Sequence, residues 1–402
     1  MTQTFGRAAD MIAAIHPEDP IHCLRPKAAR AAAQAFVAGF PGTVMYAVKC
    51  NPDRRMLRAL VDGGIRHFDT ASLPEIEAVN DLVIDDLSGD QSEPVCHFMH
   101  PVKSRRAIAE AYHRYGVRSF VLDHVDELAK ITEATGGATD LDLFIRMATP
   151  RKQAVCDLGG KFGVDGAEFV SLLRQAAPAA RRLGIAFHVG SQCLSPAAYR
   201  RSIQLAAEGA QAAGVEIAIL DVGGGFPVRY QGVTPPDWSD YFAVIDHARI
   251  EAGFSAVELY CEPGRALVAD AMSIVVRVEL RRGDALYIND GIYGGLSEFR
   301  FEGIHLPVRR HRPDGSAEDG PLLPFRFFGP TCDPVDSMPG PHWLPRDLAE
   351  GDYIEIGQTG AYSTCCRTGF NGFYSDRFVF LRDAPFHGID IPATPVRAVA
   401  AA

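Results

Sequence analysis

The sequence has no long hydrophobic run. None of its apolar stretches approaches the ~20 residues that a helix needs to cross a bilayer. Charged residues and prolines also interrupt the first twenty residues, MTQTFGRAADMIAAIHPEDP, which therefore differ from a secretory signal. We expect no membrane partner and a cytoplasmic location.

Basic residues are too few and too scattered for a nucleic-acid-binding face. The 402 residues include 40 Lys and Arg against 50 Asp and Glu, a formal net charge of −10. Because a phosphate backbone requires a basic surface, nucleic acid is not expected as a partner. Hydrophobic residues make up 47% of the chain, which is typical of a globular protein with a substantial core.

The nine cysteines lack the spacing of a metal site or of a disulfide framework. Their number is odd, and the adjacent pair Cys365 and Cys366 does not match the pattern of small secreted proteins. We therefore expect reduced thiols and no bound metal.

Short apolar runs rich in β-branched residues recur along the first two thirds of the chain. There are eight of them: TVMYAVK, IRHFDTAS, PVCHFM, SFVLDH, DLFIRMA, IAFHVGS, AILDVGGG and AVELYCEPG. Amphipathic segments of helical length separate them, so consecutive strands are expected to pair in parallel. The pattern predicts an α/β fold, a closed (β/α)8 barrel of the TIM type, with an open doubly wound sheet as the alternative.

The pattern changes after about Asp270, where strand-like pieces follow one another with Gly and Pro turns and little helical periodicity. This region predicts a separate all-β domain, a barrel or a sandwich. We expect residues 26–268 to form the α/β barrel, 269–402 the β domain, and 1–25 an N-terminal segment that packs with the β domain.

Charged and imidazole side chains follow several of the predicted barrel strands. In a barrel of this type the C-terminal ends of the strands converge on one face, where active sites lie. A single polar residue at a strand end is ordinary loop chemistry, but a set of them favours a site. The set comprises Lys49, Asp69, His97, Asp123, Arg146, His188, Gly223 to Gly225 and Glu262.

Lys49 ends the apolar run TVMYAVK, and its position has two interpretations. Most lysines in such places extend to solvent or pair with a carboxylate. A desolvated lysine with a lowered pKa instead forms a Schiff base with a carbonyl group. The other strand ends favour the second interpretation, because they offer what a phosphorylated aldehyde cofactor requires.

Two glycine-containing segments are suited to a phosphate group. DVGGGFP places three glycines after a strand, so that backbone N–H groups approach an anion without obstruction. CEPGRALVADA adds Gly264 and Arg265 after the last barrel strand, although an ion pair between Glu262 and Arg265 is the simpler structural interpretation.

Together these segments resemble a known family. YAVKCNPD, FDTAS, HVGSQC, DVGGGFP, EPGR, NDGIYGG, GPTCDPVD and GAYSTCCRTGFNGF occur in the order seen in the fold type III pyridoxal phosphate decarboxylases of basic amino acids. The resemblance is greatest to the ornithine decarboxylases and extends over residues 26–373. It implies pyridoxal 5′-phosphate as cofactor and a homodimer with shared active sites.

The resemblance also implies roles for individual residues. Lys49 carries the cofactor as an imine, His188 stacks on its ring, and Glu262 pairs with the pyridine nitrogen. A carboxylate there keeps the ring protonated, which strengthens the electron sink for the carbanion left by CO2. Asp69 and Arg146 lie near the imine. The implied phosphate contacts are Ser191, Gly224, Gly225, Gly264, Arg265 and Tyr362.

In GPTCDPVD the resemblance implies that Cys332 donates a proton to Cα and that Asp333 receives the distal ammonium group, both from the partner subunit. As isolated residues, Cys332 is a small hydrophobe and Asp333 a turn former. Phe370 is the third implied substrate contact. By an ungapped count, Phe301 and Glu302 replace the Tyr-Asp pair of the ornithine enzymes.

Aspartate at position 333, where diaminopimelate decarboxylases usually carry glutamate, favours ornithine or lysine, and of these we expect L-ornithine as substrate. The products would be putrescine and CO2, a step of polyamine synthesis. Lysine decarboxylation, alone or with ornithine, is the main alternative, and diaminopimelate is a weaker one. An alanine racemase-like enzyme and a non-catalytic regulatory paralogue also remain open, although the latter is not expected to retain Lys49 and Cys332.

Overall fold

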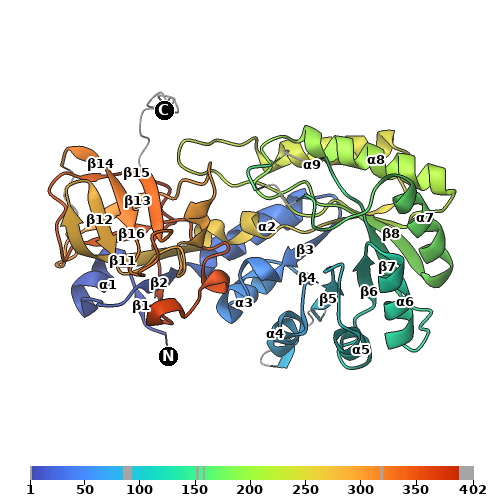
Figure 1. The fold of residues 1–402 in the computed structure, drawn as a ribbon, viewed down its shortest axis with the longest axis horizontal. Coiled ribbons are helices and arrows are strands. Elements are labelled where there is room, and N and C mark those ends of the chain that lie inside the picture. The colour runs from blue at the N-terminus through green and yellow to red at the C-terminus, as the bar shows by residue number, and fades with distance from the viewer. Residues whose placement is uncertain (1, 85–92, 151–153, 157–158, 317–319, 389–402) are drawn as a thin grey trace.

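The computed structural model describes residues 2–84, 93–150, 154–156, 159–316 and 320–388. Figure 1 shows two parts side by side along the long axis, an α/β barrel and a domain built mainly of strands. In the part of the chain that is described, no helix is both long and apolar enough to span a membrane.

Eight parallel strands close into the barrel predicted from the sequence. Each strand pairs with the next, and β10 returns to β3, with Tyr260 opposite Thr43. The open-sheet alternative is therefore wrong. The strands are β3 (Thr43–Ala47), β4 (His67–Thr70), β5 (Val95–Phe98), β6 (Ser119–Leu122), β7 (Asp142–Arg146), β8 (Arg182–Ala186), β9 (Ile219–Asp221) and β10 (Glu258–Cys261).

Helices alternate with these strands and cover the outside of the barrel (Figure 1). Local signals set their ends: Asp53 and Ser104 accept hydrogen bonds from backbone N–H groups in the first turns of α3 and α5, and Pro26 begins α2. The helices are α2 (Pro26–Gly39), α3 (Arg54–Asp62), α4 (Leu73–Ile84), α5 (Arg105–His113), α6 (Val125–Ala134), α7 (Gly166–Ala176), α8 (Ala197–Ala213), α9 (Trp238–Glu251) and the short α10 (Arg265–Val268).

The barrel has apolar side chains on both faces of its wall. Met45, Val121, Phe144 and Ile219 are fully buried in a cluster that is separate from the one beneath the helices. Burial on both faces explains why the strands appear in the sequence as continuous apolar runs. Each fully buried large side chain contributes about 1.5–3 kcal/mol, so the barrel is a rigid support for the groups at its strand ends.

The second part contains a nine-stranded sheet. Most of its strands follow residue 271, but β1 pairs with β17, and β2 lies between β17 and β11, so the N-terminal strands belong to this sheet. Helix α1 (Ala8–Ile15) buries Met11 and Ile12 against it. The strands are β1 (Thr4–Phe5), β2 (Ile21–Leu24), β11 (Met272–Arg282), β12 (Ala285–Ile288), β13 (Val308–His311), β14 (Leu322–Phe328), β15 (Ser337–Pro345), β16 (Tyr353–Ile356) and β17 (Phe378–Leu381).

Several single turns of 3-10 helix connect these elements, and three of them contain or directly precede candidate residues. They are η1 (Val48–Cys50), which follows β3, η4 (Ser297–Arg300) and η6 (Phe370–Gly372). The others are η2 (Ala177–Ala179), η3 (Ala269–Ala271) and η5 (Thr364–Cys366).

Candidate functional site

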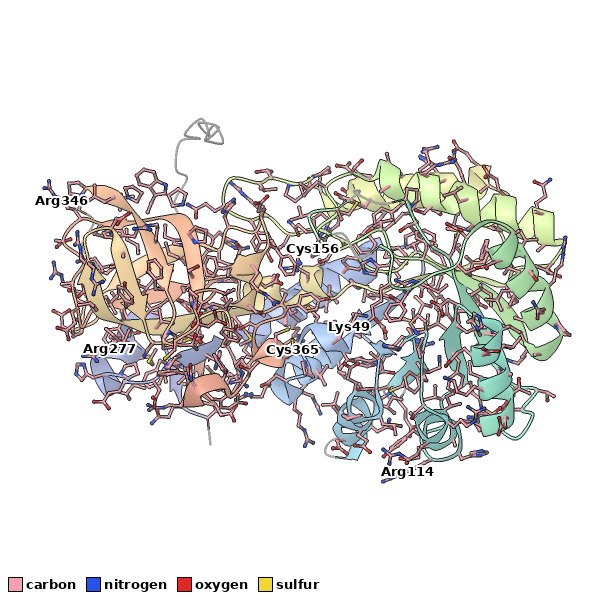
Figure 2. The ribbon with its side chains drawn as sticks, in the orientation of Figure 1. Lys49, Arg114, Cys156, Arg277, Arg346 and Cys365 are labelled. Atoms are coloured by element: carbon pink, nitrogen blue, oxygen red, sulfur yellow. The ribbon has the colours of Figure 1, made fainter. Side chains whose placement is uncertain are left out.

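Lys49 lies in η1, directly after β3, at the C-terminal end of the barrel strands, which is called the barrel mouth below. The turn is held from several sides: Asn51 N–H donates to Val48 O (3.1 Å), and the Asn51 side chain donates to Gly360 O (2.8 Å). The Lys49 side chain is 40% exposed and therefore accessible to a small molecule. Figure 2 places it between the barrel and the β domain.

The Lys49 ammonium forms an ion pair with Asp69, the third residue of β4. Burial favours the neutral amine, but the charges of Asp69 and Glu262 outweigh it and raise the pKa of Lys49. The lowered pKa expected for a desolvated lysine is therefore wrong for this side chain. Asp69 is only 1% exposed, and its Oδ1 atom has no hydrogen-bond partner among the described residues.

Glu262 follows β10 and lies close to Asp221, the last residue of β9. Burial and the neighbouring carboxylates Asp221 and Asp69 raise the pKa of Glu262 well above its ordinary range. Burial also raises the pKa of Asp221, to about 6. Within the described chain, Glu262 Oε1 and Asp221 Oδ2 are buried without a partner. Two buried carboxyl groups this close disfavour a second negative charge, so the pair favours holding a proton.

Among the described residues, Glu262 forms no ion pair with Arg265. The simpler interpretation of the EPGR motif, an ion pair between these two residues, is therefore wrong. Arg265 pairs instead with Glu298. Glu262 consequently remains available at the barrel mouth for another partner.

His188 follows β8 and is held as a neutral ring. Its Nδ1 accepts a hydrogen bond from Gly190 N–H (2.9 Å), which places the ring proton on Nε2. Burial, together with the positive charges of Arg146 and Lys49, lowers the pKa of His188 well below its ordinary value. A flat neutral ring beside Lys49 is suited to stacking on an aromatic ligand.

The loop after β9 brings bare backbone close to these groups. Gly223 and Gly225 have positive φ angles of 69° and 104°, which favour glycine. A Cβ atom on Gly224 would lie 2.9 Å from His188 Nε2, and one on Gly225 only 2.5 Å from Gly190 O. The loop thus approaches His188 and Gly190 closely only because it has no side chains, and bare backbone of this kind is typical of an anion cradle.

Arg265, the first residue of α10, completes the lining of this space. Its Nε donates to Ser191 Oγ (3.2 Å), and its guanidinium lies 5.3 Å from the centre of the Tyr362 ring. Tyr362 has a positive φ of 51° and is held through its N–H by Cys50 O (2.9 Å). We name the following set the phosphate cradle: Ser191, Gly224, Gly225, Gly264, Arg265 and Tyr362.

A second cluster lies in the β domain. Tyr293 Oη donates to Asp333 Oδ2 (2.5 Å), and its ring packs at 4.9 Å from the ring of Phe370. Cys332 N–H donates to the side chain of Asn371 (3.1 Å). The hydrogen bond from Tyr293 lowers the pKa of Asp333. Cys332 is exposed, unlike the small buried hydrophobe that its isolated motif allowed.

The two clusters do not interact directly in the part of the chain that the structure describes. Among the residues described, no hydrogen bond or ion pair joins Cys332, Asp333 or Phe370 to Lys49. Phe301 and Glu302 are exposed in the turn after η4, where Phe301 lies 5.7 Å from the Arg300 guanidinium. One chain thus presents a barrel mouth and a separate polar cluster.

The sequence reasoning missed three residues that shape these clusters: Asp221, Tyr293 and Glu298. Asp221 and Tyr293 stand inside the quoted segments DVGGGFP and NDGIYGG, so attention to every polar residue of a motif would have found them. Glu298 belongs to no motif, and only its contact with Arg265 draws attention to it.

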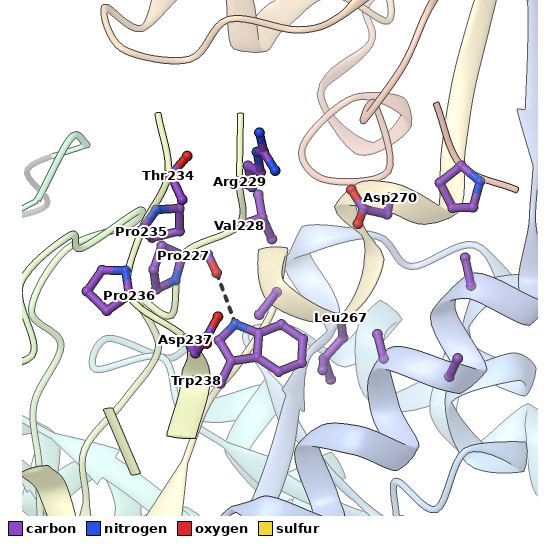
Figure 3. Close-up of a pocket in the computed structure, with 15 residues that line it drawn as sticks. Pro227, Val228, Arg229, Thr234, Pro235, Pro236, Asp237, Trp238, Leu267 and Asp270 are labelled. Atoms are coloured by element: carbon purple, nitrogen blue, oxygen red, sulfur yellow. Dashed lines mark hydrogen bonds between the residues drawn. The ribbon is translucent and has the colours of Figure 1, made fainter. Parts of the chain in front are cut away.

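A large groove lies elsewhere, on the outside of the barrel (Figure 3). Trp238 closes one side by donating from Nε1 to Pro227 O (3.0 Å), and Asp270 stands at the rim. Apart from Asp237, Asp270 and Arg229, its lining consists mainly of alanine, proline and other apolar residues. It offers none of the catalytic chemistry present at the barrel mouth.

The barrel with a strand-end lysine, buried carboxyl groups and an anion cradle defines a class of enzyme that holds a phosphorylated aldehyde. A family model, the pyridoxal binding domain of pyridoxal-dependent decarboxylases, matches residues 26–269, more than half of the chain. The chain therefore belongs to the pyridoxal-dependent decarboxylases, and it is an amino acid decarboxylase that uses pyridoxal 5′-phosphate. The resemblance seen in the sequence is confirmed.

The names of individual relatives refer to different substrates and functions. The chain is 33% identical over 350 residues to a lysine/ornithine decarboxylase of Selenomonas ruminantium, covering 85% of this chain and 84% of that protein. It is 31% identical over 358 residues to antizyme inhibitor 2 of Xenopus laevis, covering 82% and 73%. A solved structure of the Paramecium bursaria Chlorella virus arginine decarboxylase bound to agmatine superposes with a TM-score of 0.78 at 27% identity, covering 92% and 98%.

Proposed function

We propose that the chain removes the α-carboxylate of a basic amino acid, with L-ornithine as the preferred substrate and putrescine and CO2 as products. The observation that carries the proposal is the grouping of Lys49, Asp69 and Glu262 at the barrel mouth. Two of the relatives reported above are named as decarboxylases of lysine, ornithine or arginine, which supports a basic substrate.

Lys49 is the residue that would hold the cofactor covalently, through Nζ. When bound, pyridoxal phosphate supplies an electron sink for the bonding pair that CO2 leaves behind at the substrate α-carbon. The Lys49 amine must lose its extra proton before it reacts, and Asp69 is the carboxylate in contact with it. Asp69 therefore orients the amine.

Glu262 would face the ring nitrogen of the cofactor. Burial and the neighbouring carboxylates raise its pKa and so favour its protonated form, from which Oε1, buried without a partner in the described chain, can pass a proton to a basic nitrogen. A carboxylate and a protonated ring then stabilise each other at short range. The neutral ring of His188 lies at the same mouth and would pack on the face of the cofactor.

The phosphate cradle would hold the cofactor phosphate through backbone N–H groups, the Ser191 and Tyr362 hydroxyls and the Arg265 guanidinium. The residues present fit the group, because Ser191 and Arg265 supply donors for a phosphate, and the buried Glu262 Oε1 has no hydrogen-bond donor in the described chain. We expect Arg146 to add a positive charge beside His188 and the amine.

We further propose a homodimer in which the Cys332 cluster of one subunit completes the barrel mouth of the other. The lack of any hydrogen bond or ion pair between the two clusters among the described residues supports this arrangement. Asp333, with its lowered pKa, would bind the distal ammonium of a diamino acid, Phe370 would pack on the aliphatic part, and Cys332 would return a proton to Cα. Phe301 and Glu302 would border the distal end and influence chain length.

A substrate comparison tests the proposal. Purified protein loaded with pyridoxal phosphate is incubated with ornithine, lysine, arginine and diaminopimelate, and CO2 and amine products are quantified. We expect the highest kcat/KM for ornithine and the next highest for lysine. Higher kcat/KM for lysine would replace ornithine within the same class, whereas racemisation without CO2 release would contradict decarboxylation altogether.

The position of the covalent link is tested separately. Reduction of the loaded protein with borohydride, followed by digestion and mass spectrometry, should place the cofactor on the peptide that contains Lys49. Lys49→Ala should lose the label and all decarboxylase activity. A label on Lys103 or Lys161 instead would contradict the assignment.

A further inference from the structure

The arginine of the phosphate cradle already has an anionic partner inside the protein. Arg265 is 4% exposed, and its Nη1 donates both to Tyr230 Oη (2.7 Å) and to Glu298 Oε2. Nε donates to Ser191 Oγ (3.2 Å). The Glu298 side chain is 7% exposed and comes from η4 of the β domain, far along the chain from the barrel strands.

The pair is isolated as well as buried. Over the described part of the chain, Arg265 is the only ionic partner of Glu298, and Arg300 of the same turn donates to Ser297 O instead. The ion pair is therefore neutral overall. A buried guanidinium without a counter-charge is strongly unfavourable, so Glu298 stabilises Arg265 whenever no other anion is present.

A phosphate ester in the cradle would face the same guanidinium. The Nη2 group of Arg265 has no hydrogen-bond partner among the described residues, so it can still bind a phosphate oxygen while Nη1 holds Glu298. That arrangement places a phosphate with up to two negative charges near a buried carboxylate. Like charges repel far more strongly in a buried site than in water.

We propose that Glu298 is a resident counter-anion for Arg265, which weakens the binding of the cofactor phosphate and stabilises the chain after the cofactor leaves. The proposal rests on the proposed function, because it requires the cofactor phosphate to lie in the cradle. It makes Glu298 a residue that sets cofactor affinity by acting through Arg265. Because the cofactor is held less tightly and the cofactor-free chain is stabilised, the protein should take up and release the cofactor reversibly.

The experiment compares two vitamers that lack the aldehyde, so that Lys49 chemistry plays no part. The dissociation constants of pyridoxine 5′-phosphate and of pyridoxine are measured by calorimetry for the wild type, Glu298→Gln and Glu350→Gln. Glu350 is an exposed glutamate ahead of β16, so its variant removes the same charge away from the cradle. Glu298→Gln should bind pyridoxine 5′-phosphate at least tenfold tighter than the wild type, and Glu350→Gln should not.

The phosphate dependence separates repulsion from a general structural effect. Pyridoxine, which has no phosphate, should bind all three proteins within a factor of two, and Glu298→Asp, which keeps the charge, should retain wild-type affinity for the phosphate ester. Without ligand, Glu298→Gln should have a lower Tm, and pyridoxine 5′-phosphate should raise that Tm more than in the wild type. If Glu298→Gln does not fold, Glu298→Met carries the same expectation.

Equal or weaker binding of pyridoxine 5′-phosphate by Glu298→Gln would overturn the counter-anion while leaving the proposed function intact. Tightening by Glu298→Asp as well would also overturn it, because charge would not be the cause. If no protein in the series bound the phosphate ester, the result would contradict the proposed position of the cofactor. It would then also contradict the role of Glu298 as counter-anion.

Discussion

Lys49 shows how a strand end tolerates a charge beside an apolar wall. Asp69 neutralises the ammonium directly, and Glu262 adds a second attraction that raises the pKa of the amine. In the proposed function the same two carboxyl groups also serve the bound cofactor. Because they favour the charged ammonium, the amine must still lose a proton before it can react.

Replacement of Glu262 tests the role of the ring-nitrogen partner. Glu262→Gln keeps the size of the side chain but removes the acidic proton, so kcat should fall on the order of 10²-fold, the scale of losing one preorganised electrostatic group. Turnover is measured as CO2 release, and bound cofactor is counted after denaturation. Full turnover with normal cofactor content would contradict the role.

Asp221 predicts a pH-dependent stability. Its pKa is raised by burial to about 6 from an ordinary 3.8, so the neutral form is favoured in the folded protein. The resulting stabilisation is present below pH 3.8 and is lost as the pH rises through about 6. Asp221→Asn, which cannot ionise, should therefore gain stability relative to the wild type between pH 5 and pH 8 as judged by Tm, with and without added cofactor. A constant difference in Tm across that range would contradict the assignment.

At the scale of elements, a buried charge cluster connects Arg25, the residue after β2, with strands β11 and β16 of the same sheet. Glu355 in β16 is fully buried and accepts hydrogen bonds from Arg25 (3.0 Å) and Ser273 (2.7 Å). Burial opposes its ionisation, but His311, Arg309 and Arg25 outweigh that effect and lower the pKa of Glu355. Arg25 immediately precedes α2, so the cluster joins the first barrel helix to the β domain.

Glu355→Gln should lower the free energy of unfolding by about 3–5 kcal/mol, because it removes the buried carboxylate that pairs with Arg25 and Arg309 and leaves the buried Arg25 only its partner Asp383 among the described residues. The difference in unfolding free energy between the wild type and Glu355→Gln should be largest above pH 4.5, the ordinary pKa of glutamate. It should shrink as the pH falls further, since the wild-type carboxylate then takes up a proton. Denaturant titration measures both. Glu133→Gln, at an exposed pair with Arg105, is the matched control and should change stability by less than about 0.5 kcal/mol.

At the scale of the whole molecule, no hydrogen bond or ion pair joins the barrel mouth to the Cys332 cluster among the described residues, and the proposed active site combines the two clusters from different subunits. Lys49→Ala and Cys332→Ala would each inactivate both sites of a homodimer. After mixing and subunit exchange, a mixed dimer contains one intact site, which predicts recovery of roughly a quarter of wild-type activity.

Activity of the mixture is compared with that of each variant alone, and the dimer is measured by light scattering. Variants that stay inactive after demonstrated exchange would contradict shared sites. A monomer with full activity would contradict them more directly.

The sequence by itself determined the barrel, its eight strands and the candidate residues at their ends. Alternation of strand and helix is a local property, and the apolar runs are long enough to be recognised without knowledge of the fold. The motifs that contain Lys49, the glycine loop and Glu262 are equally local. They therefore predicted the class of enzyme, which the family match confirms.

Only the tertiary structure decided how the charges pair. Lys49 meets Asp69, Glu262 meets Asp221, and Arg265 meets Glu298 rather than Glu262, although these partners are 20 or more residues apart in the chain. The pKa values of the buried groups follow from those contacts and from burial, neither of which is written in a local pattern. The entry of β1 and β2 into the C-terminal sheet is a long-range pairing of the same kind.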